Sequence, residues 1–128
     1  MGADALRTWH DVRMEEAIPI LHVTDADVAV AWYERLGYEK ESEHRFEPSF
    51  PAFVSIARNG TARLFLSEHT HDAGGELAVV TTVYLRRDDL EAIAGQFDAD
   101  VVEQAWGARE ICLTDPDGNR LRIGMPSA

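Results

Sequence analysis

The side chains best suited to metal chemistry lie in two places. His69 and His71 are separated by one residue and followed directly by Asp72, and imidazole and carboxylate groups are common ligands of divalent metals. A glycine pair follows in the same loop, where ligands would be poorly ordered, so this cluster is either an adventitious metal site or ordinary surface. His22 stands alone in an apolar segment. It either packs internally or faces a cavity.

Covalent catalysis has less support. Cys112 is the only cysteine, and its position between Ile111 and Leu113 predicts a buried, unreactive thiol. A nucleophilic thiolate would need a neighbouring base and a lowered pKa. The chain has no Gly-x-Ser-x-Gly, phosphate-loop or dinucleotide-binding glycine pattern. The sequence therefore predicts neither nucleophilic nor nucleotide chemistry.

The composition restricts the classes of protein that could carry these groups. The chain has 128 residues and is 45% apolar, which suits one globular domain. Its formal charge of -11 argues against nucleic-acid binding and fits either a solubilising surface or a cationic ligand. No apolar run approaches the roughly 20 residues that span a bilayer. No secretion signal is visible, so a cytoplasmic protein that contacts no membrane is expected.

Two halves of the chain show the same order of elements, which is one strand, one helix and three strands. The first half is predicted to form them at residues 18–23, 26–36, 38–46, 53–58 and 62–67. The second half is predicted to form them at residues 78–86, 88–97, 100–104, 109–114 and 120–124. Residues 1–16 are expected to be a short helix or a loose arm, and residues 68–76 a loop.

Local signals mark the ends of these elements. Asp25 is predicted to cap the first helix, and Gly37 to end it. Asn59-Gly60 indicates a hairpin turn, and the DPDGN segment at residues 115–119 indicates a second one. The first helix is expected to bury an apolar stripe, which comprises Val28, Ala31, Trp32 and Leu36.

The two halves also resemble each other in sequence. VSIARNGTARLFL at residues 54–66 aligns with ICLTDPDGNRLRIG at residues 111–124, with one extra residue in the second turn. This alignment places Arg122 opposite Phe65. A chance match of two common turns is the alternative to a duplication, and the shared order of elements favours the duplication. The chain is therefore predicted to be α+β, with repeat halves at about 17–67 and 78–124.

This duplicated unit resembles the vicinal oxygen chelate superfamily, which includes glyoxalase I, extradiol dioxygenases and bleomycin-resistance proteins. The segments that carry the resemblance are PILHVTDADVAVAWYERLGYE, RNGTARLFLSE and WGAREICLTDPDGNRLRIG. The last of them looks closest to the bleomycin-resistance branch. The resemblance implies one domain at residues 17–128, made of two βαβββ modules whose mixed sheets curl around a cavity. It also implies a homodimer.

The resemblance identifies four positions where enzymes of the superfamily hold a divalent metal. Two of them lie seven residues before the aspartates that precede the two helices. The third lies four residues after the glycine of the DPDGN turn, and the fourth is its equivalent in the first half of the chain. In this chain the four positions hold Ile18, Thr82, Arg122 and Phe65. Isoleucine and phenylalanine have no donor atom, and arginine stays protonated. No metal cofactor is therefore expected at these positions.

Aromatic residues are the stronger candidates for a binding site. In the bleomycin-resistance branch, aromatic side chains line a groove and stack on flat drug rings, which implies that role here for Trp106, Phe46 and Phe53. Four glutamates flank these aromatics and would suit a cationic guest. They are Glu43, Glu47, Glu103 and Glu110. Arg122 is included in the predicted ligand-binding set together with Glu47 and Glu110. The alternative is that the phenylalanines are core and the glutamates are solvated surface.

Two functions follow from these observations. The first is a metal-free protein that sequesters an aromatic or cationic molecule, such as a bleomycin-type drug, in a groove at a dimer interface. The second is a divergent enzyme of glyoxalase or dioxygenase type, with metal ligands relocated to His22, or to His69 and His71. A regulatory or structural dimer without a small-molecule role is a third reading.

Overall fold

The two halves of the chain fold into matching modules. In the first, the elements are β1 (Ile20–Val23), α2 (Ala26–Glu34), β2 (Glu39–His44), β3 (Phe53–Arg58) and β4 (Thr61–Glu68). In the second, they are β5 (Thr82–Arg86), α3 (Leu90–Phe97), β6 (Val102–Gln104), β7 (Ala108–Thr114) and β8 (Arg120–Pro126). The computed structural model describes residues 15–45, 47–69 and 79–127. The predicted arm at 1–16 and loop at 68–76 lie mostly outside these ranges.

Each module forms its own four-stranded mixed sheet. The strand orders are β1-β4-β3-β2 and β5-β8-β7-β6, with the first pair of each sheet parallel and the others antiparallel. Phe65 pairs with Ile20 in one sheet, and Arg122 pairs with Tyr84 in the other. These register pairs place Phe65 and Arg122 at equivalent positions, as the repeat alignment predicted. The predicted α+β fold of two βαβββ modules is confirmed.

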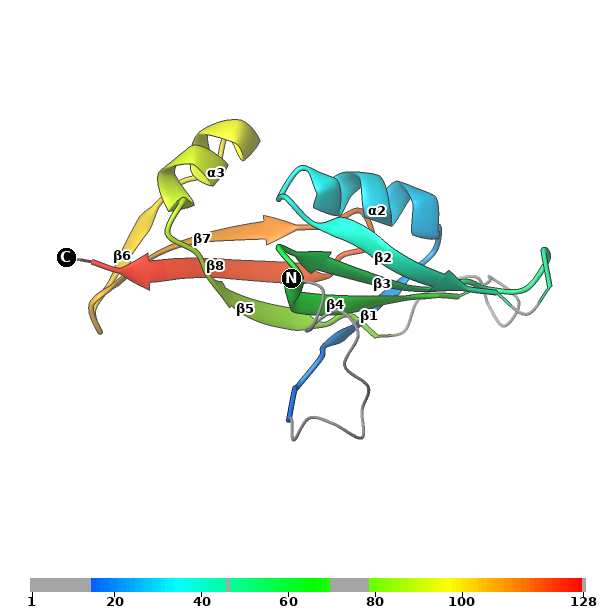
Figure 1. Ribbon diagram of the computed structural model, residues 1–128. Coiled ribbons are helices and arrows are strands. Elements are labelled where there is room, and N and C mark those ends of the chain that lie inside the picture. The colour runs from blue at the N-terminus through cyan, green and yellow to red at the C-terminus, as the bar shows by residue number, and fades with distance from the viewer. Residues whose placement is uncertain (1–14, 46, 70–78, 128) are drawn as a thin grey trace.

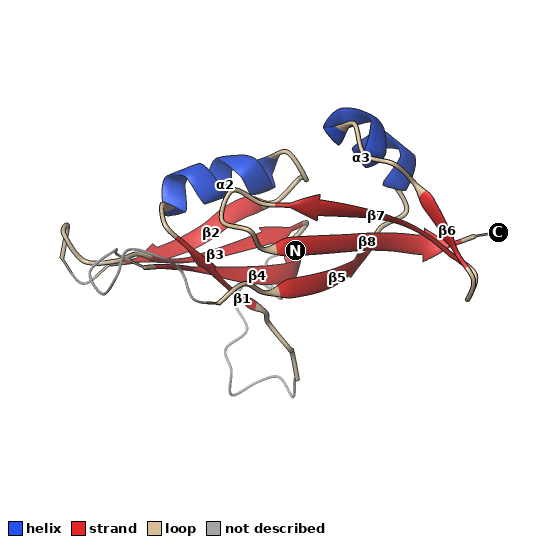
Figure 2. Ribbon diagram, turned by 180° about the vertical axis from the view of Figure 1, so that it is seen from behind, coloured by secondary structure: helices blue, strands red, loops and turns tan. Residues whose placement is uncertain are grey.

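Both helices cover the same side of the sheets (Figures 1 and 2). The core fills the space between the helices and the sheets, and its largest fully buried side chains include Tyr33, Tyr38, Leu36, Ile56, Leu121 and Ile123. On the opposite side, no described helix covers the strands (Figure 1). We call this second side the open face. No described helix is long and apolar enough to cross a membrane.

The helix caps and turns follow their local signals in most places. The Asp25 side chain accepts hydrogen bonds from the backbone of Asp27 and Val28, as predicted for a cap. Asn59 and Gly60 both have positive φ, which a two-residue hairpin turn requires. Asp89 differs from Asp25, because its side chain makes no cap hydrogen bond and binds the guanidinium of Arg87 instead.

The buried face of α2 differs from the predicted stripe. Its buried residues are Ala26, Ala29 and Tyr33, whereas Val28 is 52% exposed and Ala31 is also exposed. The prediction for Val28 and Ala31 was wrong, because α2 is short and rotated so that Tyr33 faces the second module. Sequence periodicity alone did not reveal this rotation.

The DPDGN turn joins the two modules. The carboxylate of Asp115 accepts hydrogen bonds from the backbone N–H groups of Asp117 and Asn119 and from the hydroxyl of Tyr33 on α2. Asn119 is fully buried, and its side-chain nitrogen donates to the backbone oxygen of His22 in β1. A turn that the sequence marks as a simple hairpin connection is therefore also a polar contact between the modules.

Candidate functional site

A pocket opens on the second sheet, on the open face. Its volume is about 440 Å³, and it is lined by Tyr84, Arg86, Trp106, Gly107, Ala108, Glu110, Arg122, Gly124, Met125 and Pro126. The polar members come from three adjacent strands, β5, β8 and β7. Side chains alternate between the two faces of a strand, so Tyr84 and Arg86 point to the same side of β5.

Trp106 stands at the rim of this pocket. It lies in the turn between β6 and β7, and the next residue, Gly107, has a φ of 93° that permits the turn. The indole is 65% exposed. The guanidinium carbon of Arg122 lies 5.5 Å from the centre of its ring, within the range of a cation–π contact. The sequence predicted both residues as site members, and the structure brings them together.

Glu110 lies at the base of the pocket and is only 3% exposed. Its carboxylate accepts hydrogen bonds from the hydroxyl of Tyr84 at 2.7 Å, from Nε of Arg122 at 2.7 Å and from the amide of Gln104 at 3.1 Å. The Tyr84 hydrogen bond, followed by that of Arg122, lowers the pKa of Glu110. The same hydrogen bond raises the pKa of the Tyr84 phenol. Glu110 is therefore an ionised carboxylate at neutral pH.

Gly124 makes this network possible. It pairs with Glu110 across β7 and β8, and the Tyr84 ring passes over it from β5 to reach that carboxylate. A Cβ atom at position 124 would overlap the Tyr84 hydroxyl and come within 3.0 Å of Cγ of Glu110. Because Gly124 on β8 has no side chain, Tyr84 on β5 can cross β8 and reach Glu110 on β7. Sequence reasoning missed Tyr84, Arg86 and Gly124, although the register partner of Arg122 would have indicated Tyr84.

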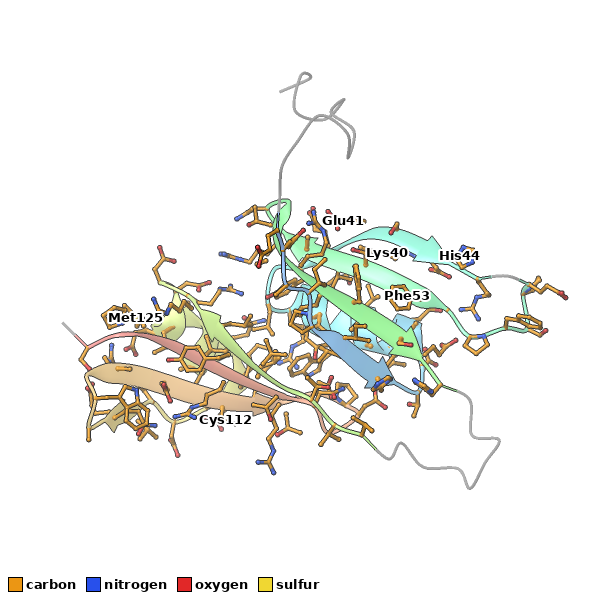
Figure 3. The ribbon with its side chains drawn as sticks, turned by 90° about the horizontal axis from the view of Figure 1, so that it is seen from below. Lys40, Glu41, His44, Phe53, Cys112 and Met125 are labelled. Carbon is orange, nitrogen blue, oxygen red and sulfur yellow. The ribbon has the colours of Figure 1, made fainter. Side chains whose placement is uncertain are left out.

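Glu110 is the third predicted site residue in the pocket, whereas Phe53 and Glu47 lie outside its lining. Phe53 belongs to the first sheet, where its ring packs edge-on against Phe65 with the centroids 5.1 Å apart. Figure 3 shows Phe53 on that sheet and Cys112 and Met125 on the other. Glu47 is exposed in the connection between β2 and β3. Phe46 lies outside the described residues. Within one chain, the structure thus brings Phe53 and Glu47 to the first module and not to the pocket.

The four positions where the superfamily holds metal do not fit a metal site. Ile18 and Phe65 have no donor atom, and Thr82 is an exposed threonine on β5. The guanidinium of Arg122 is hydrogen-bonded to Glu110. A cation at this position would repel a divalent ion. In residues 15–45, 47–69 and 79–127, no three His, Cys, Asp or Glu side chains form a group that could hold a metal.

Two of the histidines, His22 and His69, are in contact. Nδ1 of His22 lies 2.6 Å from Nε2 of His69, with the rings edge to face. His71 and Asp72, which the sequence grouped with them, lie outside the described residues. Cys112 differs from the prediction of a buried thiol. It is exposed on β7 because it alternates with the buried Ile111 and Leu113.

Comparison with known proteins places the fold in a family. A model of the glyoxalase superfamily matches residues 3–126. The chain belongs to the glyoxalase superfamily. No curated protein matches it. Solved structures of similar fold include a bleomycin resistance determinant encoded on the transposon Tn5, which is 26% identical with a TM-score of 0.68. That alignment covers 90% of this chain and 100% of the other.

Two other similar structures are of ligand-binding proteins. One is a bleomycin-binding protein complexed with bleomycin, at 26% identity and a TM-score of 0.63, covering 88% of this chain and 98% of that one. The other is TnmS3, an antibiotic-binding protein from Streptomyces sp. CB03234, at 20% identity and a TM-score of 0.63, covering 91% and 100%. At 20% identity the second likeness shows the glyoxalase-superfamily fold alone.

Proposed function

We propose that this protein binds an aromatic small molecule non-covalently, with the ligand's ring against Trp106 and without a metal ion. The observation that carries the proposal is the indole itself, which is 65% exposed at the rim of a pocket. A stacked aromatic pair contributes roughly 0.5–1.5 kcal/mol beyond the burial of its surface. The similarity to a bleomycin resistance determinant and to a bleomycin-binding protein supports a role in sequestering such a molecule.

A binding role needs no reactive group, and the described residues that line the pocket include no activated nucleophile or base. Its one carboxylate, Glu110, already accepts three hydrogen bonds, so it is poorly placed to act as a general base. The family's metal positions hold Ile18, Phe65, Thr82 and Arg122, none of which is a good ligand for a divalent ion. Affinity alone would then be the mechanism, because a tightly held drug does not reach its target.

The glutamates expected to attract a cationic ligand are mostly engaged with basic residues of the chain. Glu43 forms ion pairs with Lys40 and Arg45, and Glu103 pairs with Arg109. The aromatic part of the predicted ligand therefore has more support than the cationic part.

The groove is proposed to be completed by a second copy of the chain. The open face carries large apolar side chains that are partly exposed in one chain, among them Ile20, Phe53 and Tyr84. A second copy laid over this face would cover them and narrow the pocket. Light scattering after size exclusion should then give twice the chain mass of 14.3 kDa. A monomer at tens of micromolar would contradict the dimer.

The ligand class can be tested with bleomycin and with N-phenyl-1-naphthylamine, an uncharged probe whose emission rises in apolar sites. We expect the wild type to bind at least one of them, and Trp106→Ala to weaken binding at least tenfold. Val28→Ala is the matched control, because Val28 is a similarly exposed apolar residue on α2, away from the pocket. Absence of binding by both probes, or equal binding by Trp106→Ala, would contradict the proposal.

The metal-dependent enzyme is the second candidate, and the contact between His22 and His69 is the observation that favours it. Two imidazoles at one end of the open face are a start toward a metal site, although zinc sites in enzymes use three protein ligands. Metal analysis of the purified protein tests this candidate.

A further inference from the structure

The carboxylate of the pocket beside Trp106 already has most of its hydrogen-bonding capacity occupied. Oε1 of Glu110 accepts from both Gln104 and Arg122, and Oε2 accepts from Tyr84. Among the described residues that line the pocket, Glu110 is the only acidic one. A carboxylate accepts about four hydrogen bonds, and the burial of Glu110 leaves a positively charged ligand group little access to the remaining position. The pocket therefore offers little to a cation.

The hydrogen-bond donors of the pocket, in contrast, are only partly occupied. Nε of Arg122 donates to Glu110, and the two terminal nitrogens of Arg122 have no hydrogen-bond partner among the described residues. Its side chain is 42% exposed, so these nitrogens can reach a ligand. A guanidinium presents donors in a planar fork that matches a carboxylate.

A second arginine lines the same pocket. Arg86 lies two residues from Tyr84 on the same face of β5, and its side chain is exposed. No hydrogen bond or ion pair joins it to any described residue. The pocket thus holds two guanidinium groups and one carboxylate that is already neutralised. Its local charge is positive, although the chain as a whole carries a formal charge of -11.

The apolar part of the pocket lies beside these donors. The guanidinium of Arg122 is 5.5 Å from the ring centre of Trp106 and 5.8 Å from that of Tyr84. A ring stacked on Trp106 would therefore carry its substituents close to Arg122. Repulsion from the chain's distant acidic residues falls off over about 8 Å at physiological ionic strength and barely weakens such a contact.

We propose that the ligand of this pocket is an aromatic carboxylate, with its ring on Trp106 and its anionic group on Arg122 and Arg86. The inference rests on the proposed function and names its ligand class. A charge-assisted hydrogen bond is about twice as strong as a neutral one. An aromatic carboxylate should therefore bind more tightly than an uncharged molecule of the same shape.

Three competitors of nearly equal shape test the charge preference. They are 2-naphthoate, which is anionic, 2-naphthamide, which is neutral, and 2-naphthylmethylammonium, which is cationic. Each is titrated against bound N-phenyl-1-naphthylamine, and 2-naphthoate is also titrated alone by calorimetry. We expect 2-naphthoate to bind about tenfold more tightly than the amide, the order of effect that a hydrogen bond to a charged group gives. The ammonium compound should be weakest.

Three variants locate the effect. Arg122→Gln should remove most of the preference for the carboxylate. Arg86→Gln, which leaves the hydrogen bonds of Glu110 intact, should reduce it a few-fold. Arg120→Gln is the matched control, because Arg120 is an exposed arginine on the same strand, outside the pocket lining, and its loss changes the net charge equally. The control should keep the wild-type preference.

The outcomes separate this inference from the proposed function. If the amide and carboxylate bind equally, or the ammonium compound binds best, the inference is wrong while an aromatic site at Trp106 stands. If Arg120→Gln abolishes the preference as fully as Arg122→Gln does, the effect is one of net charge and the inference is wrong again. If bleomycin binds but 2-naphthoate does not, the inference is wrong while the proposed function stands. If bleomycin, 2-naphthoate and N-phenyl-1-naphthylamine all fail to bind, the proposed function fails and the inference with it.

Discussion

The hydroxyl of Tyr33 donates a buried hydrogen bond of 2.8 Å to Oδ2 of Asp115, 82 residues further along the chain. Tyr33 belongs to the helix of the first module, and Asp115 begins the hairpin turn of the second. Oδ1 of the same carboxylate accepts from the backbone N–H groups of Asp117 and Asn119. One side chain therefore both shapes the turn and attaches it to the neighbouring module.

Tyr33→Phe removes the hydroxyl and keeps the packed ring. We expect the free energy of unfolding to fall by about 2 kcal/mol, the typical effect of a hydrogen bond to a charged group. Denaturant unfolding followed by circular dichroism measures this change. Tyr38→Phe is a suitable control, because Tyr38 is also buried but its hydroxyl has no hydrogen-bond partner among the described residues, so its loss should change stability little. Equal unfolding midpoints for wild type and Tyr33→Phe would show that the contact adds no stability.

The same residue predicts how stability depends on pH. Burial, and then the negative charge of Asp115, raise the pKa of Tyr33 above its usual value. The unfolded chain loses this proton above about pH 10 while the folded chain keeps it, so stability is complete below that pH and falls as pH rises. The slope approaches about 1.4 kcal/mol per pH unit for one such group. Burial also raises the pKa of Tyr38, which adds to the slope.

Stability curves between pH 8 and pH 11 test this linkage. Tyr33→Phe should fall less steeply than wild type above pH 10, because one of the two buried phenols is gone. Parallel curves for the two proteins would mean that Tyr33 ionises equally easily in the folded and unfolded chains.

Several features that the sequence predicted correctly are set by neighbouring residues. The Asp25 cap and the Asn59-Gly60 turn need only a few adjacent positions, and both formed. The burial of Tyr33 depends on a carboxylate in the other module, which no local pattern contains. For the same reason, the apolar face predicted for α2, which includes Val28, differs from the face that is buried in the structure.

The residues of the pocket also fall into those that were predicted and those that were missed. Trp106 and Arg122 were predicted by resemblance to the family, and they lie together in the pocket. Tyr84 and Gly124 were missed, because their importance comes from a side chain of β5 crossing β8 to reach β7. Strand pairing decides this arrangement, and three separated strands must be placed before it can be seen. Arg86 was missed because its role depends on the same placement.

Asn119 is the second residue whose role extends beyond the turn. Its amide nitrogen donates to Asp115 and to the backbone oxygen of His22, and its amide oxygen accepts from the backbone N–H of Thr81. Asn119→Asp loses both donors and adds a charge beside Asp115. We expect it to lower the free energy of unfolding by about 3 kcal/mol or more. Asp115 and the backbone oxygen of His22 would lose their donor, and the new carboxylate would repel that of Asp115.

Asn119→Ala is the comparison that isolates the charge. It loses the hydrogen bonds without adding a carboxylate, so it should be more stable than Asn119→Asp at pH 7. The difference should shrink as pH falls below about 4, where the introduced carboxyl group becomes protonated. A constant difference across this range would contradict a repulsion between the two side chains.

Gly124→Ala should break the network of the pocket without unfolding the chain. The added methyl group overlaps the far end of the Tyr84 side chain, which is exposed enough to rotate away. The Tyr84 phenol then loses its hydrogen bond to Glu110, the first cause of its raised pKa. We expect its pKa to fall toward the ordinary value of about 10 in a spectrophotometric tyrosine titration.

Gly95→Ala provides the control for Gly124→Ala. Gly95 lies inside α3, and a Cβ atom there would meet nothing within 4 Å. Alanine is better than glycine within a helix by up to about 1 kcal/mol, so this variant should be slightly more stable and should leave the Tyr84 titration unchanged. An unchanged Tyr84 pKa in Gly124→Ala would mean that the ring does not depend on the missing side chain.

The contact between His22 and His69 leads to the last prediction, which separates the two candidate functions. At 2.6 Å the two ring nitrogens are close enough to share one hydrogen, which occupies the lone pair of one imidazole. A binding protein without a metal should therefore hold less than stoichiometric zinc, nickel, iron or manganese when it is purified without a histidine tag. Mass spectrometry of the metal content measures this directly. One equivalent of a divalent ion, lost in His22→Ala and kept in the control His44→Ala, would establish relocated ligands and favour the enzyme instead.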